Sequence, residues 1–97
     1  MDKRRKKIDP EKERALRDNF DRDIAENRLS LGEAVKTMRR ISKLTQAEFA
    51  AHRGVDLTTL KTIESGTANP RVSTLNKIAD VFGLEVRFVR RTRSHDA

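Results

Sequence analysis

The residues best suited to a specific chemical task lie between Leu57 and Ser65. A threonine hydroxyl donates and accepts hydrogen bonds, its methyl group packs against the methyl of thymine, and a lysine ammonium donates to guanine O6 and N7. Leucine offers apolar contact alone. If this stretch is a helix with one open face, its outward residues are candidates for contacting base edges in DNA: Leu57, Thr58, Lys61 and Thr62.

Catalytic and metal-binding groups are poorly represented. His52 and His95 are the only histidines and lie far apart in the sequence, and there is no cysteine. No imidazole pair or thiolate cluster is therefore indicated. The serines at 30, 65 and 73 lack the sequence context of a nucleophile elbow and are interpreted as capping or loop residues. We expect no enzyme activity, no metal site and no cofactor.

Two short helices with a tight turn must position the residues between 57 and 65. Thr45 is a good N-cap, and Glu48 stands three residues later, as a capping box requires. Gly54 can adopt the left-handed conformation that ends a helix, and Asp56 can cap the next one. A helix as short as 57–65 is unstable alone. Neighbouring helices must therefore hold Leu60 and Ile63 while the opposite face stays open, which is the construction of a helix-turn-helix.

Two further helices complete a domain at residues 30–83. Ser30 and Glu33 form a second capping box, and a helical apolar pattern continues to about Ser42. A loop with Gly, Asn and Pro covers residues 66–72. The last helix is predicted to start at Ser73 or Thr74 and to end at Gly83. Its inward residues are Leu75, Ile78, Ala79 and Phe82.

Residues 1–29 form an N-terminal extension. Five consecutive cations, Lys3 to Lys7, are followed by a predicted helix from Pro10 to about Glu26, with Asp9 as its N-cap. Leu16, Phe20 and Ile24 make a narrow apolar stripe on this helix. Such a stripe must dock onto something. It packs either on the chain's own domain or on a partner, which would be a second subunit or another protein.

Residues 84–97 form the C-terminal segment. The stretch from Leu84 to Arg91 predicts a β-strand, because its apolar residues Leu84, Val86 and Phe88 alternate with charged ones, a period of two. A lone strand exposes unpaired backbone groups. We therefore expect it to pair with the same strand of a second copy across a two-fold axis, before a basic tail from Arg90. The alternative is a continued last helix or a frayed end. The expected dimer interface comprises Leu84, Val86, Phe88 and Val89.

The composition suits a small basic domain. The 97 residues carry a net charge of +7, with 35% hydrophobic and 38% charged residues. A basic surface attracts an acidic polymer such as nucleic acid, although a merely soluble basic protein has the same balance. The N-terminal cations are not followed by an apolar run, so neither a secretory signal nor a membrane segment is expected. The absence of cysteine fits the reducing cytoplasm.

The ordered motifs of residues 31–83 resemble the phage-repressor-like (Cro/C1, or Xre) helix-turn-helix family. The matching elements are Leu44-Thr45-Gln46, Phe49-Ala50, Gly54-Val55, Leu60, Ile63-Glu64-Ser65-Gly66, Pro70 and Leu75-Asn76-Lys77-Ile78-Ala79. The resemblance implies an all-α, lambda-repressor-like fold. Two departures stand out: Lys43 replaces a frequent Gly, and Leu57, Thr58 and Thr62 replace base-reading amides of well-studied members.

The resemblance also implies roles for particular residues. Gln46 and Thr59 would hold DNA phosphates, and Arg39 would pair with Glu64 inside the protein. Helix-start amides near Thr45 can assist with phosphate binding. Additional phosphate contacts, which position a protein without reading sequence, are expected from Lys43, Arg53, Asn69 and Arg71.

These observations lead to a functional hypothesis. The chain is expected to be a cytoplasmic, homodimeric, sequence-specific DNA-binding protein that represses transcription at a palindromic operator in double-stranded DNA. One alternative is an antitoxin, which would neutralise a partner toxin and repress its own operon. The narrow apolar stripe of the N-terminal helix favours this alternative, and a strand after the last helix resembles HipB-like members of the family. Another alternative is a plain regulator with no protein partner.

Overall fold

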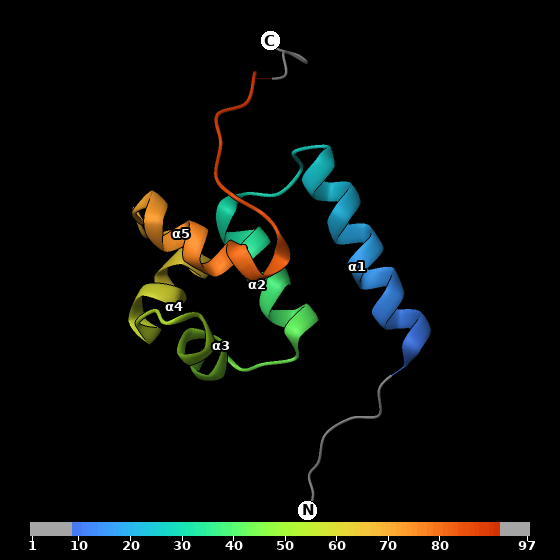
Figure 1. The fold of residues 1–97 in the computed structure, drawn as a ribbon, viewed down its shortest axis with the longest axis horizontal. Helices are drawn as coiled ribbons and strands as arrows, with labels where there is room; N and C mark the ends of the chain where they lie inside the picture. Colours follow the sequence, from blue (N-terminus) through green and yellow to red (C-terminus); the bar gives the residue numbers. More distant parts are fainter. Residues whose placement is uncertain (1–8, 92–97) are drawn as a thin grey trace, which may run out of the picture.

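Five α-helices and one 3-10 helix follow one another in residues 9–91, which are the residues that the computed structural model describes (Figure 1). The basic run from Lys3 to Lys7 and the tail beyond Arg91 lie outside the described residues. The elements are α1 (Pro10–Ala25), α2 (Leu31–Ser42), α3 (Gln46–Arg53), α4 (Leu57–Ser65), α5 (Val72–Ala79) and the 3-10 helix η1 (Asp80–Phe82).

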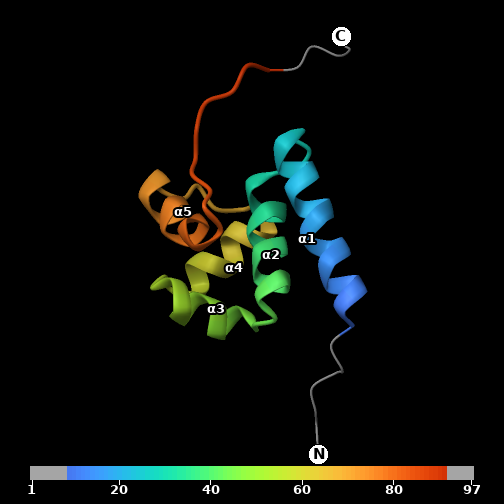
Figure 2. The same ribbon diagram turned by 45° about the vertical axis from the view of Figure 1, so that its right-hand side comes forward.

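Helix α2 lies at the centre of the fold. It contacts α1, α3, α4 and α5. Both ribbon views place α1 on one side of α2 and the other three helices on the opposite side (Figures 1 and 2). The predicted capping box starts it: the Glu33 amide donates to Ser30 Oγ at 3.1 Å, and the Ser30 amide donates to Glu33 Oε1 at 2.9 Å. Local side chains thus fix where the central helix begins.

Gly32 allows α2 and α4 to approach closely. A Cβ atom added at Gly32 would lie 2.5 Å from the backbone oxygen of Ile63. That separation is far below an ordinary carbon–oxygen contact, and a backbone oxygen cannot move aside as a flexible side chain can. Glycine is therefore required by packing at this position, since its backbone angle is that of an ordinary helix.

Helix α1 docks on the chain's own domain, as the first of the two alternatives predicted. Its N-cap is Asp9, whose carboxylate accepts from the Glu11 amide at 3.0 Å. Phe20 is buried, and Leu16 and Ile24 pack partly buried against the same core. The Phe20 ring meets the ring of Phe82 edge to face, with centroids 6.1 Å apart, a favourable aromatic geometry. Phe20 is thereby covered within one chain, and Leu16 and Ile24 are covered in part.

The last helix differs slightly from its prediction. Helix α5 begins at Val72, one or two residues before Ser73 or Thr74, because the Arg71 carbonyl already accepts hydrogen bonds from the amides of Thr74 and Leu75 at 3.1 Å. It then tightens into η1, and Gly83 ends this final turn with a φ of +69°. Gly83 thus has the predicted role.

The predicted C-terminal β-strand is wrong: residues 84–91 are irregular, and the part of the chain that the structure describes contains no strand with which they could pair. The segment instead bonds to its own domain. The Leu84 amide donates to the Ala79 carbonyl at 3.2 Å, and the Val86 amide donates to Asn76 Oδ1 at 2.8 Å. Leu84 and Val86 both pack partly buried against the core. The first part of the alternating pattern therefore reflects an irregular segment in which Leu84 and Val86 are turned toward the domain's own core.

Candidate nucleic-acid interface

Helix α4 is held by one deeply buried face. Leu60 is 0% exposed and Ile63 is 3% exposed. The predicted cap residue Asp56 accepts a hydrogen bond from the Thr59 amide at 3.3 Å, and the helix ends at Gly66, which has a φ of +80°. Burying the two apolar side chains offsets the instability of so short a helix. The opposite face is left to solvent.

The tight turn before α4 has the predicted design. Thr45 and Glu48 form the second capping box at the start of α3, with hydrogen bonds of 2.9 and 3.1 Å. Gly54 ends α3 in the left-handed conformation, with a φ of +68°. The Val55 amide then donates to the Ala50 carbonyl at 2.9 Å. Only residues 54–56 separate the two helices, so α3 fixes the direction in which α4 points.

The four expected base-reading residues differ in their availability. Thr58 and Lys61 are exposed on α4. Thr62 is half-buried, and its hydroxyl donates to the Thr59 carbonyl at 2.9 Å, which leaves its methyl group and its acceptor capacity for other contacts. Leu57 is half-buried and packs against the core. The open face of α4 is therefore centred on Thr58 and Lys61.

Two exposed residues near this face are missing from the sequence-based expectations. Ser65 lies one helical turn after Lys61, so a spacing of four residues could have revealed it. Lys36 is exposed on α2, and its charge helps to lower the pKa of Glu64. Lys36 stands three residues before Arg39, but nothing local in the sequence links it to α4.

A buried ionic network ties α2, α3 and α4 together. Arg39 Nε donates to Glu64 Oε2 at 2.8 Å, and Arg39 Nη2 donates to Glu64 Oε1 at 3.0 Å, which confirms the expected internal pair. Gln46 Nε2 donates to the same Oε1 at 3.1 Å. Arg39 Nη1 also donates to the Leu44 carbonyl at 3.1 Å. The Glu64 carboxylate of α4 thus binds both Arg39 of α2 and Gln46 of α3, and so connects all three helices.

The electrostatics of this network favour the ionised state. Burial by itself raises the pKa of Glu64, but hydrogen bonds from Arg39 and Gln46, together with the positive charge of Arg39, outweigh it and lower that pKa below its ordinary value. The hydrogen bond to Glu64 raises the pKa of Arg39. Both groups therefore remain charged at neutral pH, in a bidentate pair.

The candidate phosphate-binding residues lie at the start of α3, in and beside α4, and in the loop after it. Thr45 and Gln46 stand at the start of α3, and Gln46 keeps one of its two amide hydrogens free of Glu64. Thr59 is half-buried, whereas Asn69 and Arg71 are exposed in the loop between α4 and α5. This distribution suits a helix that enters a groove between two phosphate backbones.

Two of the candidate cations already have partners. Lys43 pairs with Glu13 of α1, and Arg53 makes a long 3.5 Å contact from Nη1 to the Lys77 carbonyl. Lys43 also holds a left-handed backbone, with a φ of +60° at the end of α2. This conformation explains why glycine suits the position better. Lys43 and Arg53 are therefore weaker phosphate candidates than Arg71.

Neither a metal site nor a membrane-spanning helix is present among residues 9–91. These residues include no group of three or more His, Cys, Asp or Glu side chains that could hold a metal ion. None of the helices in that range is both long and apolar enough to cross a bilayer.

Comparison with known proteins gives one family and one relative. The chain is 33% identical over 58 residues to the immunity repressor protein of Bacillus phage phi105, a match that covers 60% of this chain and 40% of that protein. The matched region thus spans less than half the length of that relative. No solved structure matches significantly. The profile of the HTH_3 helix-turn-helix family matches residues 35–89, which is more than half of the 97 residues. The chain therefore belongs to the phage-repressor-like helix-turn-helix family.

Proposed function

We propose that the chain is a sequence-specific DNA-binding regulator of transcription that acts as a dimeric repressor at a palindromic operator. The observation that carries the proposal is the division of α4 into two faces. Leu60 and Ile63 anchor it, whereas Thr58 and Lys61 are exposed and free of hydrogen bonds to other described side chains. A helix held this way can enter the major groove N-terminus first. The similarity to a phage immunity repressor supports the same proposal.

The proposed division of labour follows from chemistry. Lys61 donates to guanine O6 or N7, and Thr58 and Thr62 contact base edges by hydroxyl or methyl groups. Gln46, Thr59 and the α3 amides hold phosphates on one side, and Asn69 and Arg71 hold those on the other side. The Arg39–Glu64 pair does not touch DNA in this proposal. It keeps the angle between α3 and α4 constant, so that the reading residues meet the bases in one register.

A selection experiment tests the proposal. The full chain is incubated with a random library of duplex DNA, and bound sequences are enriched over several rounds. We expect two inverted half-sites with centres about 10–10.5 base pairs apart, bound on the order of 10³-fold or more tightly than random duplex. Enrichment of no sequence would rule out specific recognition. A reporter gene placed behind the selected site then distinguishes repression from activation.

Matched lysine variants test the reading helix. Lys61→Ala should cost about 1–3 kcal/mol for each bidentate base contact and should relax the preference at one position of each half-site. Lys12→Ala removes an exposed lysine from α1 and serves as the control for net charge. Equal losses in the two variants, with unchanged base preference, would show that Lys61 acts only through its charge.

The antitoxin alternative loses its main structural support. It relied on the apolar stripe of α1 as a toxin-binding surface, and Phe20, Leu16 and Ile24 pack on the chain's own core. We therefore do not extend the proposal to a toxin partner. A pull-down from the native host, analysed for protein as well as DNA, would reveal such a partner.

A further inference from the structure

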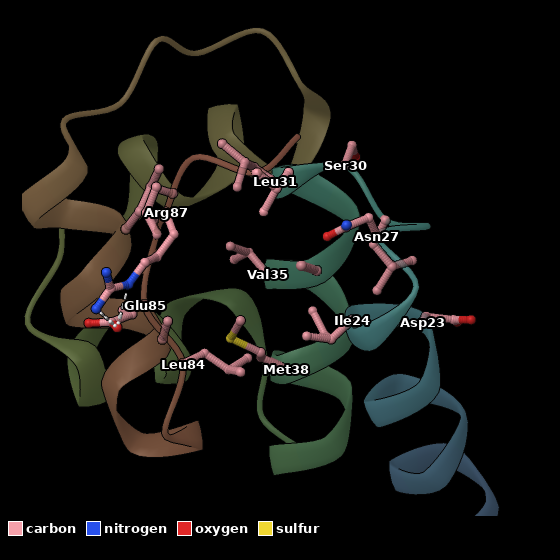
Figure 3. A pocket seen from close by; sticks show the side chains of 16 residues that line it. Asp23, Ile24, Asn27, Ser30, Leu31, Val35, Met38, Leu84, Glu85 and Arg87 are labelled. Carbon is pink, nitrogen blue, oxygen red and sulfur yellow. Dashed lines mark hydrogen bonds and ion pairs between the residues drawn. The ribbon is translucent and has the colours of Figure 1, made fainter. Parts of the chain in front are cut away.

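An apolar groove lies on the side of α2 between the end of α1, α5 and the C-terminal segment (Figure 3). Its volume is about 220 Å³. Ile24, Val35 and Met38 line its interior, and Leu31, which is 53% exposed, stands at its edge. Small-molecule sites usually measure about 300–1,000 Å³. The groove is smaller than that and fits a single large side chain better.

The structure also contains an apolar side chain without a contact. We call residues 84–91 the C-terminal arm. Its first half is held on the domain by Leu84 and Val86, but Phe88 is fully exposed. Both the Phe88 ring and the groove expose apolar surface to water. Inserting a phenylalanine ring into the groove would bury both surfaces, which is favourable.

Phe88 does not line the groove of its own chain. Val86, Arg87 and Val89 form one wall of that groove, and Phe88 is absent from the lining. Since Val86 is fixed by its hydrogen bond to Asn76, the arm would have to leave this wall before its own Phe88 could enter. The same ring carried by another molecule faces no such restriction.

We propose that Phe88 of a second copy of this chain occupies the groove, so that two copies exchange their arms reciprocally. This inference deepens the dimer in the proposed function and rests on it. A two-fold axis makes each copy both donor and acceptor, which gives two identical contacts. The exchange needs no β-ladder, so it agrees with the irregular backbone of the arm.

Charge complementarity favours this occupant. The arm carries Arg90 and Arg91 directly after Phe88 and Val89, and both arginines are exposed. The lining of the groove carries two carboxylates, Asp23 and Glu85, and one cation, Arg87, which pairs with Glu85. The Asp23 carboxylate lies at the outer edge of the groove and points away from its interior (Figure 3). The C-terminal end of a helix also carries partial negative charge. Since Glu85 and Arg87 neutralise each other, Asp23 leaves the edge of the groove with one excess negative charge, which favours a basic arm there.

Area sets the expected strength. Stable interfaces bury about 1,200–2,000 Å² in total, and each phenylalanine supplies about 150–250 Å². Two such side chains bury about 300–500 Å², well below that size, so the two arms should give a weak dimer that operator DNA would strengthen. Anchoring side chains in such small interfaces carry most of the binding energy.

Sedimentation of the full chain without DNA provides the first test. Phe88→Ala should weaken dimerisation on the order of 10³-fold, because two anchors are lost and each is worth about 30-fold or more. Val81→Ala removes an exposed valine outside the groove and is the matched control. A wild-type chain that is monomeric at 1 mM, or a Phe88→Ala dimer as tight as that of the control, overturns the proposal.

Methyl NMR tests the position of the ring. Met38 lies in the groove, and Met1 is the only other methionine. With methyl-labelled methionine, the Met38 signal should shift with protein concentration as a phenyl ring arrives, and Phe88→Leu should remove most of this shift because leucine has no ring current. A Met38 signal that is unchanged on dimerisation, or a ring effect that is independent of concentration, contradicts exchange between copies.

The two proposals can fail separately. Arm exchange is measured without DNA, whereas the reading helix is measured by base preference on a selected half-site. Phe88→Ala should still prefer that half-site over a scrambled duplex. A Phe88→Ala variant that forms no dimer yet keeps this preference supports both proposals. A Phe88→Ala variant that dimerises as tightly as the wild type contradicts arm exchange alone.

Discussion

Replacing Arg39 with methionine should destabilise the fold strongly through the charge it leaves behind. The Glu64 side chain is 3% exposed, whereas that of Arg39 is 20% exposed. Arg39→Met keeps the packing of the side-chain stem but leaves a buried carboxylate with the Gln46 amide as its remaining side-chain partner. Breaking a buried pair in this way costs about 3–5 kcal/mol. That is a large part of the total of about 5–15 kcal/mol for a domain.

The reverse change should be milder. Glu64→Gln leaves Arg39 with a neutral partner, and the more exposed guanidinium can reach water, so we expect a cost of about 1–3 kcal/mol. The double variant Arg39→Met/Glu64→Gln should then be more stable at pH 7 than Arg39→Met alone, because it contains no carboxylate to bury. Urea unfolding of the four proteins at 10–15 °C measures this coupling.

The pH dependence provides a check on the mechanism. In the wild type the pKa of Glu64 is lowered, so its stabilising contribution is present above its ordinary pKa near 4.5 and disappears as the pH falls through the lower folded value. In Arg39→Met, burial should raise the pKa of Glu64 instead, and protonation then relieves the penalty as the pH falls. The single and double variants should therefore converge near pH 4. Equal stability at pH 7 would show that the charge is not the cause.

Three further changes follow from close contacts, backbone angles and charge. Gly32→Ala should destabilise by about 1–3 kcal/mol despite the higher helix propensity of alanine, because its Cβ meets the Ile63 oxygen. Arg40→Ala at an exposed position of the same helix is the control, and an unchanged midpoint in urea for Gly32→Ala would contradict the contact. Lys43→Gly should be about 1 kcal/mol more stable than Lys43→Ala, since both lack the ammonium but only alanine strains the left-handed backbone; equal melting temperatures would refute this. A dimer that neutralises about six to ten phosphates should bind the selected operator on the order of 10³–10⁵-fold more weakly at 200 mM than at 50 mM salt. If residues 1–7 touch DNA, their deletion should reduce the slope of log affinity against log salt concentration.

Helix starts were predictable because their signals are local. Ser30 with Glu33, and Thr45 with Glu48, are three residues apart, and both capping boxes form as expected. The Arg39–Glu64 pair joins residues 25 positions apart, and only the family resemblance indicated it. The contact between Lys43 and Glu13 spans 30 positions and had no signal in the sequence. Long-range partners depend on how helices pack, which side-chain periodicity alone does not determine.

The C-terminal segment shows why a period of two was misread. Alternation reports that every second side chain faces an apolar surface; it does not say whether that surface belongs to a sheet. Here the surface is the domain's own core, and Asn76 of α5 supplies the acceptor that a neighbouring strand would have offered to the Val86 amide. Phe88 is the first apolar residue of this alternating pattern that does not pack against its own chain, since it is fully exposed.

The central position of α2 separates the two proposed activities. One stripe of this helix, with Gly32, Lys36 and Arg39, faces α4 through the Ile63 oxygen and the Glu64 carboxylate. A second stripe lines the groove: Leu31, Ala34, Val35 and Met38. The groove residues do not contact the Arg39–Glu64 network by any hydrogen bond, so exposed changes at the groove should leave that network intact, although both stripes adjoin the same core. Base preference should therefore respond to the α4 stripe, and dimerisation should respond to the groove stripe. In each copy, α2 would connect the groove to α4 and so fix the position of the reading helix relative to the proposed dimer contact.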